Sequence, residues 1–326
     1  MKEFKYQKTE LDVVYINFKT YKDVCFSIKS LITCFKDTNA FFSIYILDNS
    51  FSLGSREEIK NLMKFSKDFS NNQFNISYLA SDTNMGFGKG CNKAASYGKA
   101  ENILFINCDT DLSPLDAKKF LISIQNKDPK VVISGPKIFS SNGLIHSSCF
   151  SFDPISIMLK PLRHIRRIGR ISKIIPKYKW FKKRIDRITY EGLPKDKISY
   201  VDWLSGCFLL VNRKFFIEIG GFDDRYFLYF EDVDLCRSAR QLSYLVMFDP
   251  TINVIHNARY QSSSYKGILK SILFNVTARY HISSWLKYIW KWRRDFIYKL
   301  LKECGYYRNN KKIFKDSDFS RFNNVR

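Results

Sequence analysis

Hydrophobic and polar positions in the first 135 residues follow two alternating patterns. Short runs rich in Val, Ile, Leu, Phe and Tyr predict buried strands, and longer stretches with apolar residues every three or four positions predict helices. The predicted strands are residues 11–16, 43–47, 74–79, 102–107 and 131–134. The predicted helices are residues 23–35, 55–69, 89–99 and 113–125. This alternation predicts an α/β fold with a mainly parallel sheet and helices on both faces.

The pattern resumes after a long basic stretch, residues 136–200, that carries no motif with evident chemistry. A strand is predicted over 208–211, followed by helices over 213–219 and 232–242. A strand, a turn at Pro250 and a second strand that ends on His256 complete the predicted fold.

Polar residues lie at the ends of several predicted strands, where an open parallel sheet binds its ligands. Asn17 follows the first strand and Asp48 the second. Asp48 could accept hydrogen bonds from a nucleobase or ribose, and an Asx-turn explains it equally well. The loop after the third strand, SDTNMGFGKGCN, contains three glycines whose backbone a ligand could approach closely. It matches neither the dinucleotide fingerprint, which belongs after the first strand, nor a Walker A loop.

The fourth strand ends in the sequence NCDTD, residues 107–111. Carboxylates at a strand exit, without His or Cys beside them, suit a hard divalent cation such as Mg²⁺ or Mn²⁺ that completes its shell with phosphate oxygens. Asp109 is the first candidate ligand and Asp111 the second, with a surface turn as the alternative.

Three carboxylates open the predicted helix over 232–242, directly after the aromatic segment YFLYF. A single acid at a helix start is usually a cap that the helix dipole stabilises. Glu231, Asp232 and Asp234 lie within four residues of one another. Their mutual repulsion and a partly dry surrounding predict that at least one pKa is raised toward that of a working base.

Two further residues have both a functional and a structural interpretation. Trp203 precedes a Ser-Gly turn and suits a platform under a sugar ring, while a core aromatic is comparably expected. His256 is a lone histidine at a strand end, and such residues are most often structural.

Composition narrows the class of protein. With 326 residues and 45% hydrophobic content the chain can bury a full core. It has no apolar run of about 18 residues and no leader pattern, so we expect neither a spanning helix nor a secretion signal, and a cytoplasmic location. The eight cysteines form no C-x-x-C pair, which argues against a zinc site or a disulfide framework and fits a reducing compartment.

The net charge of +23 is concentrated in two tracts, residues 160–187 and 285–302. Both tracts interleave Lys and Arg with bulky aliphatic and aromatic residues, which suits the headgroup region of an anionic membrane. A solvated helix face and a nucleic-acid surface are the alternatives. We favour the membrane and expect no nucleic-acid partner, because no nucleic-acid-binding motif accompanies the tracts.

The string GGFDDRYFLYFEDVDLCRSAR, with VDWLSGCFLLVNRKFF before it and INVIHN after it, resembles the glycosyltransferase family 2 enzymes, particularly the rhamnosyltransferase-like branch. The likeness covers most of residues 11–260. It implies a GT-A type, Rossmann-like nucleotide-binding fold over residues 1–262, followed by a basic amphipathic helical extension over 263–326. Within the domain it implies a nucleotide-sugar-binding half (11–135), a variable basic insertion (136–200) and an acceptor and catalytic half (201–262).

The resemblance also implies roles for individual residues. Asn107 falls at the first acid of the family's D-x-D element and Asp109 at the second, so the metal site holds less charge than usual. Asp48 contacts the donor's nucleoside, and His256 reaches toward the metal or diphosphate. The residues implied around the sugar-nucleotide donor are Asn17, Asp48, Asn84, Gly86, Gly88, Asn92 and Asn107.

On this interpretation the enzyme is inverting and metal-dependent. Asp109, with Asp111 or His256, holds Mg²⁺ or Mn²⁺ on the diphosphate, and Asp232 is the general base for the acceptor hydroxyl. Glu231, Asp234 and Trp203 position the base or the acceptor. The donor is a dTDP- or UDP-linked sugar, rhamnose or a hexose. The acceptor is a lipid-linked saccharide at the inner face of the cell membrane, in bacterial O-antigen or capsule synthesis.

Two hypotheses from other classes stay open at this point. A catalytically silent sugar-nucleotide-binding partner would bind donor whether or not Asp232 is intact. A nucleic-acid-binding protein would explain the charge and leaves the two acidic motifs without purpose.

Overall fold

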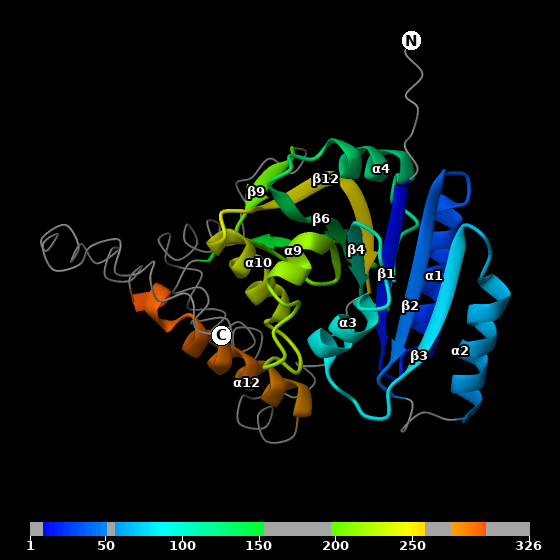
Figure 1. Ribbon diagram of the computed structural model, residues 1–326, viewed down its shortest axis with the longest axis horizontal. Helices are drawn as coiled ribbons and strands as arrows, with labels where there is room; N and C mark the ends of the chain where they lie inside the picture. The colour runs from blue at the N-terminus through cyan, green and yellow to red at the C-terminus, as the bar shows by residue number, and fades with distance from the viewer. Residues whose placement is uncertain (1–8, 51–55, 153–196, 258–274, 298–326) are drawn as a thin grey trace, which may run out of the picture.

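A computed structural model gives the structure of the chain and describes residues 9–50, 56–152, 197–257 and 275–297. A central sheet runs through it in the order β3-β2-β1-β4-β11-β6-β12-β5 (Figure 1). The strands on this path are β3 (Phe74–Ala80), β2 (Ala40–Asp48), β1 (Thr9–Asn17), β4 (Asn102–Ile106), β11 (Phe208–Asn212), β6 (Val131–Phe139), β12 (Leu245–His256) and β5 (Thr110–Asp111). Short strands add to it or pair beside it: β7 (Ile145–His146), β9 (Ser199–Val201), β8 (Cys149–Phe150) and β10 (Trp203–Leu204).

Strands β1 to β4 form a parallel half of the sheet. β1 pairs in parallel with β2 and β4, and β2 pairs in parallel with β3. The carboxyl ends of these strands therefore meet at one edge, with Asn17 in register with Asp48. The mainly parallel α/β sheet predicted from the hydrophobic pattern is confirmed.

The second half of the sheet departs from the predicted pattern in two places. β11 runs antiparallel to both β4 and β6. β12 is one strand with an irregularity between Asp249 and Asn253, where the sequence predicts two strands and a turn. Pro250 lies in this bulge, because proline has no N–H to donate to a ladder.

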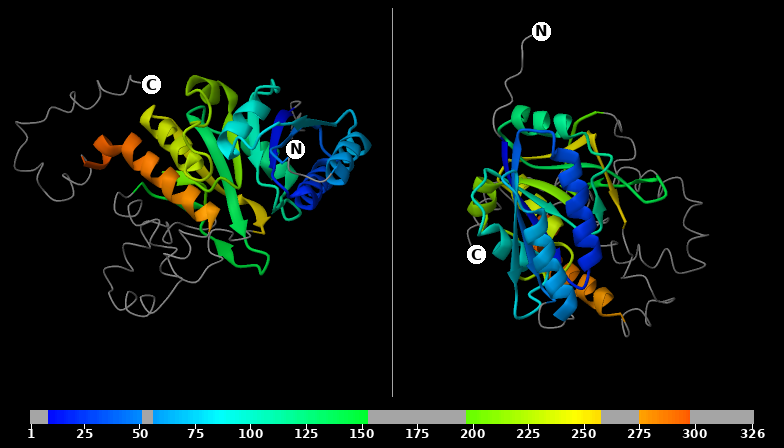
Figure 2. Two further views of the ribbon diagram at one scale, coloured as in Figure 1. Left: turned by 90° about the horizontal axis from the view of Figure 1, so that it is seen from below. Right: turned by 90° about the vertical axis from the view of Figure 1, so that its right-hand side faces the viewer.

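Helices cover both faces of the sheet (Figures 1 and 2). Side chains along β1 point alternately to the two faces of the sheet. Leu11, Val13 and Tyr15 therefore lie in one hydrophobic core, and Val14 lies in the other. The first core contains α1 (Tyr21–Phe35), α2 (Arg56–Phe69) and α4 (Ala117–Asn126). The second contains α3 (Phe87–Ala95), α9 (Arg213–Glu218), α10 (Glu231–Gln241) and α12 (Val276–Lys291).

The start of α4 differs from the prediction. The helix is capped by Asp116, whose carboxylate accepts a hydrogen bond from the Lys119 N–H at 3.0 Å. Ser113 lies in the turn before it, where its N–H donates to Asp111. A carboxylate aimed at a free N–H is the stronger cap, so the helix begins at Ala117.

The basic segments are described only in part. Residues 153–196 of the predicted insertion, and 263–274 and 298–326 of the predicted extension, lie outside the described residues. α12 lies within that extension, and its Tyr288 and the following Trp292 and Phe296 are buried in the second core. Of the helices that the structure describes, none combines the length and apolar character needed to cross a membrane.

Candidate active site

Asp48 is buried at the end of β2 and held by neighbouring side chains. Its Oδ1 accepts hydrogen bonds from Asn17 Nδ2 (2.9 Å) and from the N–H (2.9 Å) and hydroxyl (2.6 Å) of Ser50. Its Oδ2 accepts one from the Tyr78 hydroxyl (2.8 Å). Burial and the carboxylate raise the pKa of Tyr78, so this hydroxyl remains a donor. The carboxylate is preorganised at the strand ends, and its contact with a nucleoside stays a prediction.

Gly86 brings the glycine loop against the segment that joins α9 to α10, which we call the α9–α10 loop (residues 219–230). Gly86 has a φ of +85°, and a Cβ there would lie 2.3 Å from the Phe227 carbonyl oxygen. The same carbonyl accepts a hydrogen bond from the Phe87 N–H at 2.9 Å. On its other side, the Gly86 carbonyl accepts one from Asn49 Nδ2 (2.8 Å), and the Gly86 N–H donates to Asn84 Oδ1 (3.0 Å). Only glycine fits this position.

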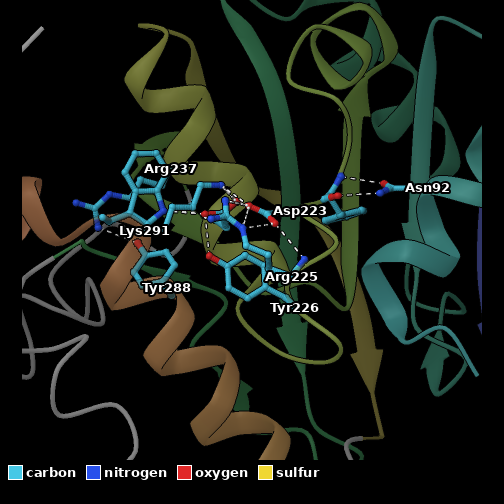
Figure 3. A network of polar contacts seen from close by, with 10 residues as sticks. Asn92, Asp223, Arg225, Tyr226, Arg237, Tyr288 and Lys291 are labelled. Atoms are coloured by element: carbon cyan, nitrogen blue, oxygen red, sulfur yellow. Dashed lines mark hydrogen bonds and ion pairs between the residues drawn. The ribbon is translucent and has the colours of Figure 1, made fainter. Parts of the chain in front are cut away.

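Asn92 on α3 clamps the α9–α10 loop with both ends of its amide (Figure 3). Its Oδ1 accepts from the Phe222 N–H (2.8 Å), and its Nδ2 donates to the Phe222 carbonyl (2.7 Å) and to Asp224 (3.1 Å). Gly88 lies beneath the same loop, since a Cβ there would be 3.1 Å from Phe222. These contacts hold the loop in front of α10, and direct roles for Asn92 and Gly88 at the donor stay predictions.

Asp109 and His256 meet where β4 and β12 end. His256 Nε2 lies 3.1 Å from Asp109 Oδ1, and the Asn257 N–H donates to the Asp109 carbonyl at 2.9 Å. The side chains are 24% and 17% exposed, so both can be reached from solvent. A carboxylate and an imidazole at this spacing fit a divalent ion that takes its remaining ligands from phosphate oxygens and water.

Asp111 does not join this pair. Its two carboxylate oxygens accept hydrogen bonds from the N–H (2.9 Å) and hydroxyl (3.0 Å) of Ser113. Within the described part of the chain, no three His, Cys, Asp or Glu residues gather as they would around a metal ion. The structure therefore favours the turn interpretation for Asp111 and leaves Asp109 and His256 as the candidate ligands.

Gly206 and Cys207 connect the NCDTD motif to Asp232. The Gly206 N–H donates to Asp232 Oδ2 at 2.9 Å. The Cys207 carbonyl accepts from the Asn107 N–H (2.9 Å) and the Thr110 hydroxyl (3.3 Å). Burial raises the pKa of the Cys207 thiol to about 12, and the charges of Asp109 and Asp232 both contribute. The Gly206–Cys207 segment therefore links Asp232 to the NCDTD motif.

Gly206 is a site residue that the motif analysis missed. A Cβ at this position would lie 3.0 Å from the Asp232 Cβ, so a larger residue would push against the Asp232 side chain. The Ser-Gly pair that follows Trp203 is the sequence signal for it. Asp232 Oδ1 accepts a hydrogen bond from the Val233 N–H at 2.8 Å. The side chain is partly exposed at the start of α10.

The other two carboxylates of the cluster are buried. Glu231 is buried at the first position of α10. Asp234 accepts hydrogen bonds from Trp292 Nε1 (2.7 Å), Lys291 Nζ (2.7 Å) and the Tyr226 hydroxyl (3.2 Å). Burial raises its pKa, and the Lys291 charge opposes the shift. The predicted raised pKa is therefore found at Asp234, with burial rather than mutual repulsion as its main cause.

Trp203 is 6% exposed and lies in the second core. Its ring stacks on Phe150 with centroids 4.2 Å apart, and its Nε1 donates to the Ser151 carbonyl at 3.4 Å. A sugar platform needs an accessible ring face. The structure favours the core-aromatic interpretation of Trp203.

Arg237, on the buried side of α10, anchors α12, and the sequence had not indicated it. It is 3% exposed and donates to the Tyr288 hydroxyl (2.8 Å) and the Asp295 carboxylate (2.7 Å). Its guanidinium also lies 4.8 to 5.6 Å from four ring centroids, those of Phe152, Tyr288, Trp292 and Phe296. These contacts replace the hydration that the buried cation has lost.

Comparison with known proteins gives this arrangement a context. A family model described as "Glycosyl transferase family 2" matches residues 12–189. The rhamnosyltransferase WbbL of Escherichia coli (strain K12) is 27% identical over 214 residues, which cover 63% of this chain and 70% of WbbL. The N-acetylglucosaminyl-diphospho-decaprenol L-rhamnosyltransferase of Mycobacterium tuberculosis (strain CDC 1551 / Oshkosh) is 26% identical over 202 residues, which cover 58% of this chain and 61% of that enzyme.

Among solved structures, GalNAc-T7 with UDP, GalNAc and Mn²⁺ superposes with a TM-score of 0.57. The two are 14% identical, and the match covers 98% of this chain and 54% of the GalNAc-T7 chain. At this identity the likeness shows the fold alone, and it is the GT-A fold.

Proposed function

The chain belongs to glycosyl transferase family 2, in its rhamnosyltransferase-like branch, and on that premise we propose that it moves rhamnose or a hexose from a nucleoside diphosphate to a saccharide acceptor during surface polysaccharide synthesis. One observation carries the assignment of the site. The Gly206–Cys207 segment hydrogen-bonds Asp232 on one side and Asn107 on the other. This shared segment keeps a base and a diphosphate-binding motif next to each other.

Asp232 is the general base. Its Oδ2 is oriented by the Gly206 N–H and its Oδ1 by the Val233 N–H, and each oxygen keeps a further lone pair for a hydroxyl proton. The acceptor oxygen loses its proton to Asp232 as it attacks the anomeric carbon. A single displacement of this kind inverts the anomeric centre.

Asp109 and His256 are the metal ligands. A carboxylate beside an imidazole at a solvent-accessible strand edge fits Mg²⁺ or Mn²⁺. When bound, the ion supplies positive charge against the leaving diphosphate. Asn107, at the start of the motif, adds no charge, so the diphosphate itself contributes much of the affinity for the metal.

The donor's nucleoside lies over the ends of β1 and β2. Asp48 and Asn17 are prearranged there, and the Gly86 loop closes the site against the α9–α10 loop. Rhamnose on dTDP and a hexose on UDP are the two donor classes we propose.

The acceptor is a lipid-linked saccharide, and the protein docks on an anionic membrane. The name of the mycobacterial relative, which includes a diphospho-decaprenol, supports the lipid.

The proposed membrane-docking surface lies on and just beyond α12. Three apolar side chains are exposed there, those of Leu286, Ile297 and Trp290, the last 68% exposed. Arg293 stacks on Trp290 at 4.3 Å. Binding to phosphatidylglycerol vesicles and not to phosphatidylcholine vesicles is the expected result, and equal binding to both counts against it.

Hydrolysis of a panel of dTDP- and UDP-sugars by the purified protein, with and without Mn²⁺, tests the proposed function. We expect Mn²⁺-dependent release of one nucleoside diphosphate and its loss in Asp109→Ala. Asp111→Ala is the matched control, because both carboxylate oxygens of Asp111 already accept hydrogen bonds from Ser113. If no donor is turned over, with or without a lipid-linked acceptor, but donor still binds, the protein is a silent binding partner.

A further inference from the structure

Lys291 of α12 bridges two carboxylates of the catalytic half (Figure 3). Its Nζ lies 2.7 Å from Asp223 in the α9–α10 loop and 2.7 Å from Asp234 in the first turn of α10. Asp223 is also paired with Arg225. One side chain from the C-terminal helix therefore joins the loop to the helix that carries Asp232.

Further contacts from α12 hold the loop between these two points. The Ser284 hydroxyl donates to the Leu228 carbonyl (2.8 Å), and Lys287 Nζ donates to the Arg225 carbonyl (2.8 Å). His281 lies against the rings of Tyr229 and Phe230, at centroid distances of 5.0 and 5.5 Å.

The loop needs such support because its last two residues are strained. Tyr229 and Phe230 have φ values of +69° and +70°, a left-handed conformation that side chains with a Cβ rarely adopt. Phe230 is the N-cap of α10, and its side chain makes no capping hydrogen bond. Strained residues persist only where surrounding contacts determine them. Here the following residues are Glu231 and Asp232, so the strained turn sets where the base points.

Asp232 and Asp234 fix the first turn of α10 from two sides. Asp232 binds the Gly206 N–H, on the side of the strand ends, and Asp234 binds α12. Asp234 is 3% exposed, so its carboxylate has protein groups in place of water.

We propose that Lys291 is a positioning residue for catalysis: by pairing with Asp223 and Asp234 it holds the strained α9–α10 loop and aims Asp232 at the acceptor hydroxyl. The inference rests on the proposed glycosyl transfer and adds to it a residue outside the sequence motifs. α12 is on this view a part of the active site, although it begins 20 residues after the end of β12.

The pH dependence of the pair gives a signature that a purely structural contact lacks. Burial raises the pKa of Asp234, and the Lys291 charge and hydrogen bond lower it. Removing Lys291 therefore raises this pKa further, so Asp234 becomes protonated at a higher pH and the ionised, positioning form is lost sooner as the pH falls. Among the described residues, the titratable or charged groups that face Asp234 include Lys291 and Tyr288 on α12, Asp223, Arg225 and Tyr226 before α10, and Cys236 on α10.

The test compares Lys291→Met with Arg279→Met, an equal change of charge at an exposed position of α12. With the sugar nucleotide that the wild type hydrolyses, we expect kcat of Lys291→Met to fall by roughly 10- to 100-fold and donor KM to stay within about threefold. The acid limb of its kcat–pH profile should move to higher pH. Arg279→Met should match the wild type. Asp234→Asn fixes this residue in a neutral form, so alone or in a double variant with Lys291→Met it should lower kcat to a similar extent and remove the part of the acid limb that Asp234 contributes.

The inference is overturned if kcat of Lys291→Met equals that of the wild type. It is also overturned if kcat falls only in proportion to a loss of thermal stability and the acid limb of the pH profile does not move. Either result leaves the proposed function intact. No turnover by the wild type overturns both. If Lys291→Met does not fold, the double variant is compared with Asp234→Asn alone. Equal kcat supports a role of Lys291 through Asp234, and a further loss in the double variant counts against it.

Discussion

Two buried carboxylates, Asp48 and Asp234, stand at the two sides of the site and are stabilised in opposite ways. They are 2% and 3% exposed. Asp48 is surrounded by neutral donors, those of Asn17, Ser50 and Tyr78, on or beside adjacent parallel strands. Asp234 depends on a cation, Lys291, that comes 57 positions later in the chain.

The difference shows which half of the site is self-supporting. Backbone pairing of β1, β2 and β3 already brings the partners of Asp48 together, so the sheet itself builds the donor side. The loop before α10 contains strained residues, and the first turn of α10 contains the buried carboxylate of Asp234. The neighbouring strands do not supply a cation for this carboxylate, and Lys291 of α12 does. The structural effects of substitutions on the donor side should stay local, whereas those of substitutions around α10 should extend to the α9–α10 loop and α12.

The largest expected effect is the loss of the base in Asp232→Asn. The amide oxygen can still accept the Gly206 N–H, so the loop keeps its geometry, but proton abstraction is lost and kcat falls by about 100- to 10,000-fold. Donor affinity, measured by titration, should stay within about twofold. Asp224→Asn, a change of the same kind at an exposed position in the α9–α10 loop, should retain nearly full turnover. Equal losses in both variants would remove Asp232 from its catalytic role.

An intermediate effect, on stability, is expected from Arg237→Met, which removes the buried cation between α10 and α12. Two hydrogen bonds and the aromatic contacts are lost, and methionine recovers only part of the packing. The free energy of unfolding should fall by about 2 kcal/mol. Urea unfolding measures it, with Arg240→Met on the exposed side of α10 as the control. Hydrogen exchange should rise in the α9–α10 loop and α12 and not in β1 or β2, and a uniform rise would contradict the local support by α12.

The smallest effect is expected from Tyr78→Phe on the donor side. One of the four hydrogen bonds to Asp48 is removed, while Asn17 and Ser50 keep theirs. Stability should fall by about 1 kcal/mol, and kcat should be unchanged because α10 has no part in this contact. A kcat loss as large as that of Lys291→Met would break the distinction between the two halves.

The hydrophobic pattern predicted much of the fold. Each parallel strand was found within a few residues of its predicted limits, because side chains of a buried strand need apolar surroundings on both faces. The antiparallel direction of β11 and the unbroken course of β12 were not predicted, since strand direction depends on how the chain returns to the sheet.

Residue chemistry and motif spacing by themselves determined the family likeness, the acidic motif at the start of α10 and Asp109 as a candidate metal ligand, and the family resemblance added His256. Tertiary structure alone decided that Gly206 supports Asp232, that Asp111 turns to Ser113, that Trp203 is buried and that Lys291 reaches Asp234. The physical reason is distance along the chain. Local sequence specifies caps, strands and helix faces, whereas the partner of a buried charge is set by which distant element packs over it, and short-range patterns carry no record of that packing.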